Sequence, residues 1–500
     1  MKKALSVFIL FLMIFQVSSA FSAGAEESTM NNKKYGLHVE ENGDITLEGE
    51  KFYGFGVNYF GAFVRYVDRQ DPDRKDFVRA FAELKEYNIP FIRMPLTGFY
   101  PTYYDLYDSD PELVYSYMDT VLEEARKNGI GVIVSLMWWD PSIAAHVGEK
   151  RAYMGIEGSK TLEYSKNYTA AIVSRYADHP AVWGWEIGNE YNLNADLCDK
   201  EFKNFLWYEN APGMTYDNID GYDYYTSEEL RYFYTEIAKV IRQYDTYRMI
   251  TTGNGEMRPF ARALWEGSQK ANKKHLWNLK WDSDTYEEFV TMNEYFTPDP
   301  IDTLCFHLQQ GSADGSKTYV MEFQRFGRKV TDEEYYKAYY DTAKKLGKAC
   351  FFGEFGDFLE METDEKCLEN FKKTVTAIEN SGIQIAALWQ FQDYTNEGIS
   401  GEKLAALSET NKALREKGSQ NTEKAWEEHT EPVTAAPETE PQTEKQTEKQ
   451  TEKQTEKTAE TEKLPEKTEN KTNIIPVIIA AAAAAAVAAA VIIVIKKKKR

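Results

Sequence analysis

Short apolar runs alternate with longer amphipathic segments along the body of the chain, residues 34–418. Eight runs rich in β-branched and aromatic residues predict strands at 52–57, 91–96, 131–137, 182–189, 249–253, 301–307, 349–354 and 383–391. Apolar residues recur at helical spacing near 74–87, 111–128, 162–177, 227–244, 331–346, 364–381 and 403–417, and helix-like material at 256–300 fills the remaining crossover. This repeated strand–helix alternation predicts an α/β fold, a (β/α)₈ TIM barrel.

Local signals support the ends of some of these elements. The segment from Leu37 to Phe52 predicts an N-terminal β-hairpin that turns at Asn42-Gly43, a dipeptide typical of tight hairpin turns. Pro111 suits the first turn of a helix, and Asp110 before it can cap that helix.

The two ends of the chain differ in composition from the body. Residues 1–25 combine basic residues, an apolar stretch and small residues, which predicts a secretory signal peptide. Residues 419–473 are rich in Thr, Glu, Lys and Pro and contain four tandem Gln-Thr-Glu-Lys repeats, so we expect a disordered stalk. Residues 474–495 are uncharged and long enough to form a transmembrane helix, and residues 496–500 form a basic tail that is expected to be cytoplasmic.

These ends place the body on the extracellular face of the membrane, anchored at its C-terminus. The alternative is a cell-wall attachment signal, which also joins a hydrophobic stretch to a basic tail. The nearest pentapeptide, Leu464-Pro465-Glu466-Lys467-Thr468, departs from the usual Leu-Pro-x-Thr-Gly pattern at its last two positions. The length of the apolar segment favours the retained membrane helix.

The chain is strongly acidic, with a formal net charge of −21 at pH 7. Such a body lacks the basic stripe of a nucleic-acid-binding protein, and it suits a neutral substrate better than a polyanionic one. The cysteines Cys198, Cys305, Cys350 and Cys367 are too few for a disulfide scaffold and match no zinc pattern. A Cys305–Cys350 disulfide is conceivable, but two buried thiols are favoured. We expect a monomer.

Two predicted strands end in a glycine followed closely by glutamate. The first ends in Gly188-Asn189-Glu190 and the second in Gly353-Glu354. Residues at the C-terminal ends of barrel strands face the active site. Two such glutamates are what double-displacement glycoside hydrolysis needs, with carboxyl groups about 5–5.5 Å apart and with no metal or cofactor.

On these residues the chain resembles the retaining glycoside hydrolases of the β/α-barrel clan (clan A), closest to the family 5 cellulase and mannanase group. Asn-Glu at the end of the fourth strand and Glu at the end of the seventh carry the resemblance, which covers the body. It implies that Glu190 is the proton donor and general acid/base and that Glu354 is the nucleophile. Asn189 would then donate its amide to a sugar hydroxyl beside the reacting carbon.

Three further residues match positions of this family. Arg93 matches the second-strand arginine, which would hold the nucleophile ionised, and an arginine in an apolar strand also needs a carboxylate partner. His307 matches the sixth-strand histidine. Trp389 matches the eighth-strand tryptophan, whose indole would pack against the apolar face of a sugar ring.

The chain also departs from the family pattern at two places. Gln309 occupies the position where a tyrosine usually follows the sixth-strand histidine, and no histidine follows the third strand, where Trp138-Trp139 occurs instead. We expect one of these tryptophans, Trp138 in the first instance, to provide a sugar platform and the other to belong to the core. Asn58, at the end of the first strand, either contacts substrate or caps the following turn.

The resemblance therefore implies an extracellular retaining glycoside hydrolase whose partner is a neutral β-linked polysaccharide or oligosaccharide, such as mannan, glucan or a related polymer. A non-catalytic carbohydrate-binding protein on the same fold is one alternative, because fold alone does not establish function. A transglycosylase is the other, since it differs only in the acceptor of the sugar. The retained pair of glutamates, with its arginine and histidine, favours catalysis over binding alone.

Overall fold

A closed barrel of parallel strands forms the centre of the molecule. The computed structural model describes residues 35–67, 75–96, 101–198, 220–269, 279–310, 322–357, 363–392 and 399–417. Within these residues eight strands close the barrel in the order β12–β13–β4–β5–β6–β7–β8–β9. Their bounds are β4 (Gly54–Asn58), β5 (Phe91–Pro95), β6 (Gly131–Met137), β7 (Val182–Gly188), β8 (Met249–Thr251), β9 (Thr303–Gln310), β12 (Ala349–Asp357) and β13 (Ile385–Leu388). The predicted eight-stranded parallel barrel is confirmed.

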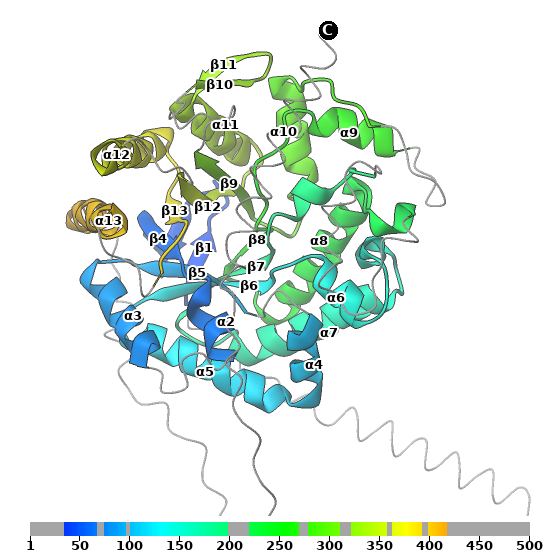
Figure 1. Cartoon of the computed structure of the whole chain (residues 1–500), viewed down its shortest axis with the longest axis horizontal. Helices are drawn as coiled ribbons and strands as arrows, with labels where there is room; N and C mark the ends of the chain where they lie inside the picture. The colour runs from blue at the N-terminus through cyan, green and yellow to red at the C-terminus, as the bar shows by residue number, and fades with distance from the viewer. Residues whose placement is uncertain are drawn as a thin grey trace, which may run out of the picture.

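Helices surround the barrel (Figure 1). The seven helices expected from apolar spacing are present within a few residues of their predicted ends, as α3 (Lys75–Glu86), α5 (Pro111–Lys127), α7 (Lys160–Tyr176), α8 (Ser227–Tyr244), α11 (Asp332–Lys345), α12 (Asp364–Ser381) and α13 (Ile399–Glu416). The segment 256–300 contains α9 (Ala261–Ser268) and α10 (Tyr286–Tyr295). Asp110 caps α5 as predicted, because its side chain accepts from the Leu113 amide.

Three short helices were not predicted from the sequence. They are α2 (Gly61–Val67), α4 (Pro101–Ser109) and α6 (Pro141–His146), which follow strands β4, β5 and β6. With 6 to 9 residues each, they are too short for an apolar repeat to stand out. Short 3₁₀ turns, η1 (Arg151–Gly155), η2 (Tyr191–Asn194) and η6 (Gly221–Asp223), complete the loops in the described part of the chain.

The predicted ends of the last barrel strand were wrong. The sequence indicated residues 383–391, whereas β13 ends at Leu388. Beyond it, the chain makes single hydrogen bonds from the Trp389 amide to Phe355 and from the Phe391 amide to Asn58. The apolar run continues because these residues turn over the end of the barrel instead of extending its ladder.

The N-terminal hairpin is present and covers one end of the barrel. Strands β1 (Leu37–Val39) and β2 (Ile45–Leu47) pair antiparallel, Gly43 in the turn has φ +75°, and a third short strand, β3 (Glu50–Lys51), follows. The Gln384 side chain, just before β13, bonds to the backbone of Ile45 and Phe52. This sheet therefore lies at the N-terminal ends of the barrel strands, and the C-terminal ends remain for a functional site.

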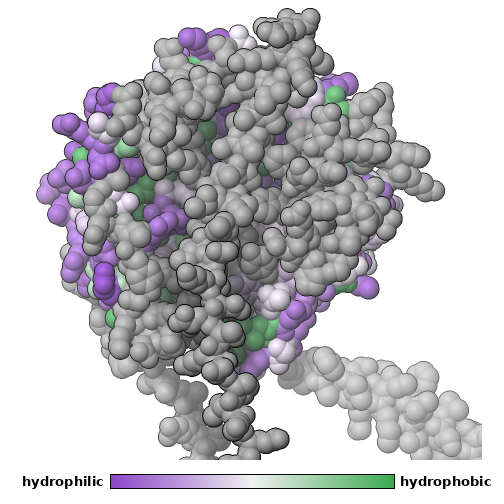
Figure 2. Space-filling model, viewed as in Figure 1, coloured by the Kyte–Doolittle hydropathy of each residue, from purple (hydrophilic) through white to green (hydrophobic). Residues whose placement is uncertain are grey.

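A second strand pair, β10 (Glu322–Arg325) and β11 (Arg328–Thr331), forms a hairpin between β9 and α11. The four cysteines are buried and form no disulfide, so the favoured pair of thiols at Cys305 and Cys350 is confirmed. Hydrophilic side chains dominate the surface near α12 and α13 (Figure 2). Among the described residues the large exposed hydrophobic side chains are Val78, Tyr244 and Tyr286.

The predicted terminal segments lie outside the described residues. They are the signal peptide at 1–25, the stalk at 419–473, the transmembrane helix at 474–495 and the tail at 496–500. In the part of the chain that the structure describes, no helix combines the length and apolar character needed to cross a membrane.

Candidate active site

Arg93 lies at the centre of a buried polar cluster at the C-terminal end of the barrel. Its Nη1 donates to Oε1 of Glu354 at 2.7 Å and to Oδ1 of Asn58 at 2.8 Å, and its Nη2 donates to Oδ1 of Asn189 at 2.7 Å. These partners come from β12, β4 and the end of β7, which the closure of the barrel brings together. The predicted contact between Arg93 and Glu354 is thus present.

Glu186, in the interior of β7, also belongs to this cluster, and it was missed from the sequence. Arg93 Nε lies 2.9 and 2.8 Å from its two carboxylate oxygens, and Nη2 lies 2.7 Å from Oε1. Both side chains are fully buried. A glutamate inside an apolar strand is a signal that could have revealed it, because a buried carboxylate needs a charged or hydrogen-bonding partner.

Glu190 extends from a strained backbone immediately after β7. Its φ is +56°, and its amide donates to the Gly253 carbonyl at 2.8 Å. Gly253 itself has φ +72°, and a Cβ there would lie 2.0 Å from the Gly188 carbonyl oxygen. The close packing of these two loops therefore requires glycine at 253 and fixes the direction in which Glu190 points.

Glu190, Glu354 and His307 meet at one point. His307 Nδ1 lies 3.2 Å from Oε1 of Glu190 and 3.5 Å from Oε1 of Glu354. One oxygen from each carboxyl group and a ring nitrogen of His307 all lie within 4.8 Å of one another. The two glutamates predicted from the sequence are therefore neighbours across the barrel mouth.

The surroundings of these groups shift their pKa values. Burial raises the pKa of Glu190 to about 7, against the opposing effect of Arg93, although its side chain remains 31% exposed. Burial also raises the pKa of Glu354, while His307 and Arg93 act in the opposite direction. Burial lowers the pKa of His307 to about 4, so the imidazole is neutral at pH 7. We assign its proton to Nδ1, which then donates to Oε1 of Glu190.

Aromatic side chains form one wall of the site. The Trp138 ring stacks on Trp389 with centroids 6.3 Å apart, and the Arg93 guanidinium lies 4.6 Å from the Trp138 ring centroid. Trp138 is only 3% exposed, so the expectation that it forms an open sugar platform was wrong: its indole covers Arg93. Trp139 and Trp389 are half-buried and retain surface for a ligand. The Trp389–Gln390 peptide bond is cis.

The two asparagines occupy different positions in the cluster. Asn58 is fully buried, and its amide nitrogen donates to the Gly353 carbonyl at 2.9 Å. It therefore fixes the position of Arg93, whose Nη1 donates to its oxygen. Its side chain has no exposed surface to offer a substrate, and its amide donates to carbonyls of β12 and β13 instead of capping the following turn. Asn189 is half-buried, and its oxygen accepts from Arg93. This bond directs its amide nitrogen away from Arg93, which leaves a donor for a ligand.

Among the residues that the structure describes, two groups of side chains have donor atoms close enough to hold a metal ion. One contains Glu190, His307 and Glu354, and the other contains Glu186, Cys305 and His307. In both groups a carboxylate is already paired with the Arg93 guanidinium, which supplies the positive charge that a cation would supply. The expectation that no metal is needed stays a prediction.

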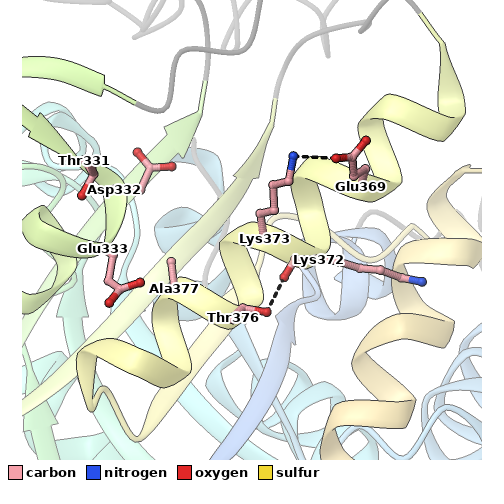
Figure 3. Close-up of a pocket in the computed structure, with 8 residues that line it drawn as sticks. All are labelled: Thr331, Asp332, Glu333, Glu369, Lys372, Lys373, Thr376 and Ala377. Carbon is pink, nitrogen blue, oxygen red and sulfur yellow. Dashed lines mark hydrogen bonds and ion pairs between the residues drawn. The ribbon is translucent and has the colours of Figure 1, made fainter.

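A separate hollow on the outside of the barrel lies between α11 and α12 (Figure 3). It is lined by Thr331, Asp332, Glu333, Glu369, Lys372, Lys373, Thr376 and Ala377. Lys373 pairs with Glu369 along one helix at 2.6 Å, so these charges already satisfy each other. This hollow holds none of the buried, shared carboxylates that mark the barrel mouth.

The fold and this cluster define a parallel (β/α)₈ barrel with paired carboxylates at its C-terminal end. The model of the Cellulase family (glycosyl hydrolase family 5) matches residues 52–395. The chain belongs to glycosyl hydrolase family 5.

Individual relatives are more distant. The chain is 24% identical over 297 residues to a probable mannan endo-1,4-beta-mannosidase A-1 of Aspergillus terreus, which covers 57% of this chain and 59% of that protein. It is 24% identical over 296 residues to mannan endo-1,4-beta-mannosidase F of Aspergillus clavatus, covering 57% and 52% respectively. The chain thus spans little more than half the length of these relatives. The endo-1,4-beta-mannanase structure from Rhizomucor miehei is 15% identical, with a TM-score of 0.49 over 76% of this chain and 99% of that one.

Proposed function

We propose that this protein is a retaining glycoside hydrolase that cleaves neutral β-linked polysaccharides or oligosaccharides by double displacement. The observation that carries the proposal is the close approach of Glu190 and Glu354, with Arg93 bound to only one of them. Retaining enzymes need carboxyl groups about 5–5.5 Å apart, and a closest oxygen separation within 4.8 Å agrees with that spacing. An inverting enzyme needs a wider gap to admit water between them.

The contacts of the two glutamates favour different roles. Glu354 accepts from the Arg93 guanidinium, and a neighbouring positive charge favours the ionised form that a nucleophile needs. Glu190 is more exposed, and a pKa of about 7 keeps it protonated over the mildly acidic range. A proton donor and an ionised nucleophile at the same site are the pair that the reaction requires.

Each step of the reaction then has a residue to perform it. The Glu354 carboxylate attacks the anomeric carbon while Glu190 passes its proton to the departing glycosidic oxygen, which gives a covalent glycosyl–enzyme and a free alcohol. Glu190, now ionised, takes a proton from water as that water attacks the anomeric carbon. The bond to Glu354 breaks, and the sugar is released with its original configuration.

Mannan is the first substrate that we propose. The two relatives described above are named as mannan endo-1,4-beta-mannosidases. Mannan is also a neutral polymer, which suits a chain with a formal net charge of −21. The half-buried faces of Trp139 and Trp389 would contact the apolar faces of its sugar rings.

We further propose that the enzyme works on the outer face of the cell membrane. The apolar segment 474–495 and basic residues 496–500 would hold it there, with residues 419–473 as a spacer. Membrane fractionation of cells that express the full chain tests this location. Recovery of the intact chain, still carrying residues 474–500, in the soluble fraction would reject it.

The activity itself is tested with purified protein on mannan, β-glucan and their oligosaccharides, with product sizes followed by chromatography. Proton NMR of the first products gives the anomeric configuration before mutarotation, and retention is expected. Glu354→Gln should abolish turnover, and Glu354→Ala with azide should instead yield a glycosyl azide of inverted configuration. First products of inverted configuration from the wild type would reject double displacement.

A further inference from the structure

Glu186 performs no step of the proposed reaction, although it makes more contacts with Arg93 than any other acceptor described above. Both of its oxygens accept from Nε, and Oε1 also forms an ion pair with Nη2 at 2.7 Å. Its side chain has no exposed surface, so a substrate cannot reach it. Any influence of Glu186 on catalysis must therefore pass through Arg93.

Acceptors surround the Arg93 guanidinium on all three of its nitrogens. A guanidinium carries five N–H donors in one plane: one on Nε and two on each Nη. Glu186 accepts from the Nε donor and forms an ion pair with Nη2 at 2.7 Å, Asn189 accepts from Nη2, and Asn58 and Glu354 accept from Nη1. Because the group is rigid and planar, an acceptor fixed along the Nε–Nη2 edge determines where the Nη1 donors point.

We propose that Glu186 is a positioning residue that fixes the plane of Arg93, shares its positive charge, and thereby sets both the orientation and the acidity of Glu354. This inference rests on the proposed double-displacement function. The Trp138 ring covers one face of the same guanidinium, with its centroid 4.6 Å from Cζ of Arg93. Glu186 therefore contacts one edge of the guanidinium plane, and Trp138 contacts one face.

The charges around Glu354 determine the sign of the effect. Glu354 faces Arg93 from β5, His307 from β9 and Glu190 after β7, while Glu186 from β7 and the Cys305 thiol from β9 lie behind the arginine. Arg93 is the permanent cation of this set, and two carboxylates share it. Removing the charge of Glu186 leaves the guanidinium to Glu354, so the ionised nucleophile becomes more stable and less basic.

Two substitutions separate charge from position. Glu186→Gln keeps the size and removes the charge, so the acid limb of kcat/KM, which reports the ionisation of Glu354, should move to lower pH. Glu186→Asp keeps the charge but withdraws the carboxylate by one methylene, so the acid limb should stay in place. Both variants should lose about 10²-fold in kcat, because Arg93 and Glu354 are displaced from the reacting geometry.

Asp245→Asn provides a matched control at the other end of the barrel. Asp245 forms a buried ion pair with Arg248 at 2.9 Å, with 3% and 4% of the two side chains exposed. The substitution should lower Tm, because it leaves the buried Arg248 without its carboxylate partner. It should move neither limb of the pH profile. An equal movement of the acid limb in Asp245→Asn would overturn the proposal.

The remaining outcomes also decide the question. Wild-type kcat and an unmoved acid limb in a folded Glu186→Gln protein would overturn the proposal. If Glu186→Gln does not fold, Glu186→Asp decides: reduced kcat at a native Tm supports positioning, and wild-type kcat overturns it.

If the wild type hydrolyses no glycoside, the proposed function fails, but ¹³C NMR titration of Glu354, assigned by loss of its signal in Glu354→Gln, still tests the inference. An unchanged pKa of Glu354 in Glu186→Gln would overturn the positioning role of Glu186, and a lower pKa of Glu354 would support it.

Discussion

The Arg93 guanidinium donates from Nη1 to Oε1 of Glu354 over 2.7 Å, with the arginine side chain fully buried and the glutamate 4% exposed. This bond distinguishes the two glutamates of the site, because Arg93 bonds to Glu354 and not to Glu190, whose carboxyl group instead lies 3.2 Å from Nδ1 of His307. An ion pair with so little contact with water is screened weakly by salt. The charge of Arg93 should therefore have a large effect on the pKa of Glu354, the proposed nucleophile.

The first prediction follows from that bond. Arg93→Ala removes a positive charge beside Glu354, so the pKa of Glu354 should rise and the acid limb of kcat/KM should move to higher pH. Arg93→Lys keeps the charge but loses the planar fork, so it should lose rate with a smaller movement of that limb. Rate–pH profiles of the three proteins on one substrate measure both effects.

Folding must be measured alongside these rates. Arg93→Ala leaves Glu186 and Glu354 buried without their cation, a loss that is typically about 3–5 kcal/mol of unfolding free energy. Thermal unfolding followed by circular dichroism gives the fraction folded at the assay temperature. If Arg93→Ala is folded and keeps both its rate and its acid limb, Arg93 has only a structural role.

Much of this site was predictable because its residues lie at the ends of recognisable strands. Glu190 and Glu354 each follow a short apolar run and a glycine, so the barrel pattern and the family resemblance locate them. The contact between Arg93 and Glu354 was also predictable, because a buried arginine needs a carboxylate. The sequence pattern does not show which carboxylates lie next to Arg93, so the ion pair between Arg93 and Glu186 was not predicted.

Side-chain direction was the least predictable property. Trp138 and Trp139 are adjacent in an apolar strand end, and only the fold shows that Trp138 covers Arg93 while Trp139 keeps surface. Asn58 likewise reads as a strand-end polar residue that could face a ligand. Its burial follows from the closure of the barrel, which brings the Ala387 carbonyl of β13 and the Gly353 carbonyl of β12 within reach of its amide.

A second prediction concerns the glycine beneath Glu190. Gly253→Ala places a Cβ against the Gly188 carbonyl oxygen at a residue with φ +72°, so both the backbone conformation and the contact become unfavourable. We expect a lower Tm and a large loss of kcat, because the Glu190 amide bonds to the Gly253 carbonyl. Gly158→Ala is the matched control: its φ is +73°, but no atom lies within 4 Å of the new Cβ. It should lose about 1 kcal/mol of stability and no activity.

A third prediction concerns the β10–β11 hairpin, which is tied to a loop beside the site. Arg325 Nε donates to Oε1 of Glu256 at 2.9 Å, and the Tyr335 hydroxyl donates to the same oxygen at 3.0 Å. Glu256 follows Gly255, whose Cβ position lies 3.1 Å from Oε1 of Glu190. Arg325→Ala removes the hydrogen bond to Glu256, so the loop that contacts Glu190 should become more mobile and kcat should fall.

The same hairpin supplies a control for that experiment. Arg328 pairs with Glu334 at 3.0 Å, but the two side chains are 57% and 47% exposed. Exposed pairs of this kind contribute about 0–1 kcal/mol, so Arg328→Ala should change neither Tm nor kcat appreciably. Equal kinetics for the two variants would show that the hairpin does not act on the site through Glu256.

The final prediction is the shape of the wild-type pH profile. Activity requires Glu354 ionised and Glu190 protonated, so kcat/KM should fall below the pKa of the first and above the pKa of the second. Burial raises the pKa of Glu354 above its usual 4.5 and raises that of Glu190 to about 7. The plot of kcat/KM against pH should therefore be a narrow bell with its maximum at mildly acidic pH. Because the carboxyl groups are close, the two limbs report the pair as a coupled system.

Glu190→Gln removes the donor, so on aryl glycosides with good leaving groups formation of the glycosyl–enzyme should persist without the basic limb, whereas polysaccharide cleavage should be lost. A basic limb that survives in Glu190→Gln would assign the proton to another group and contradict the role proposed for Glu190.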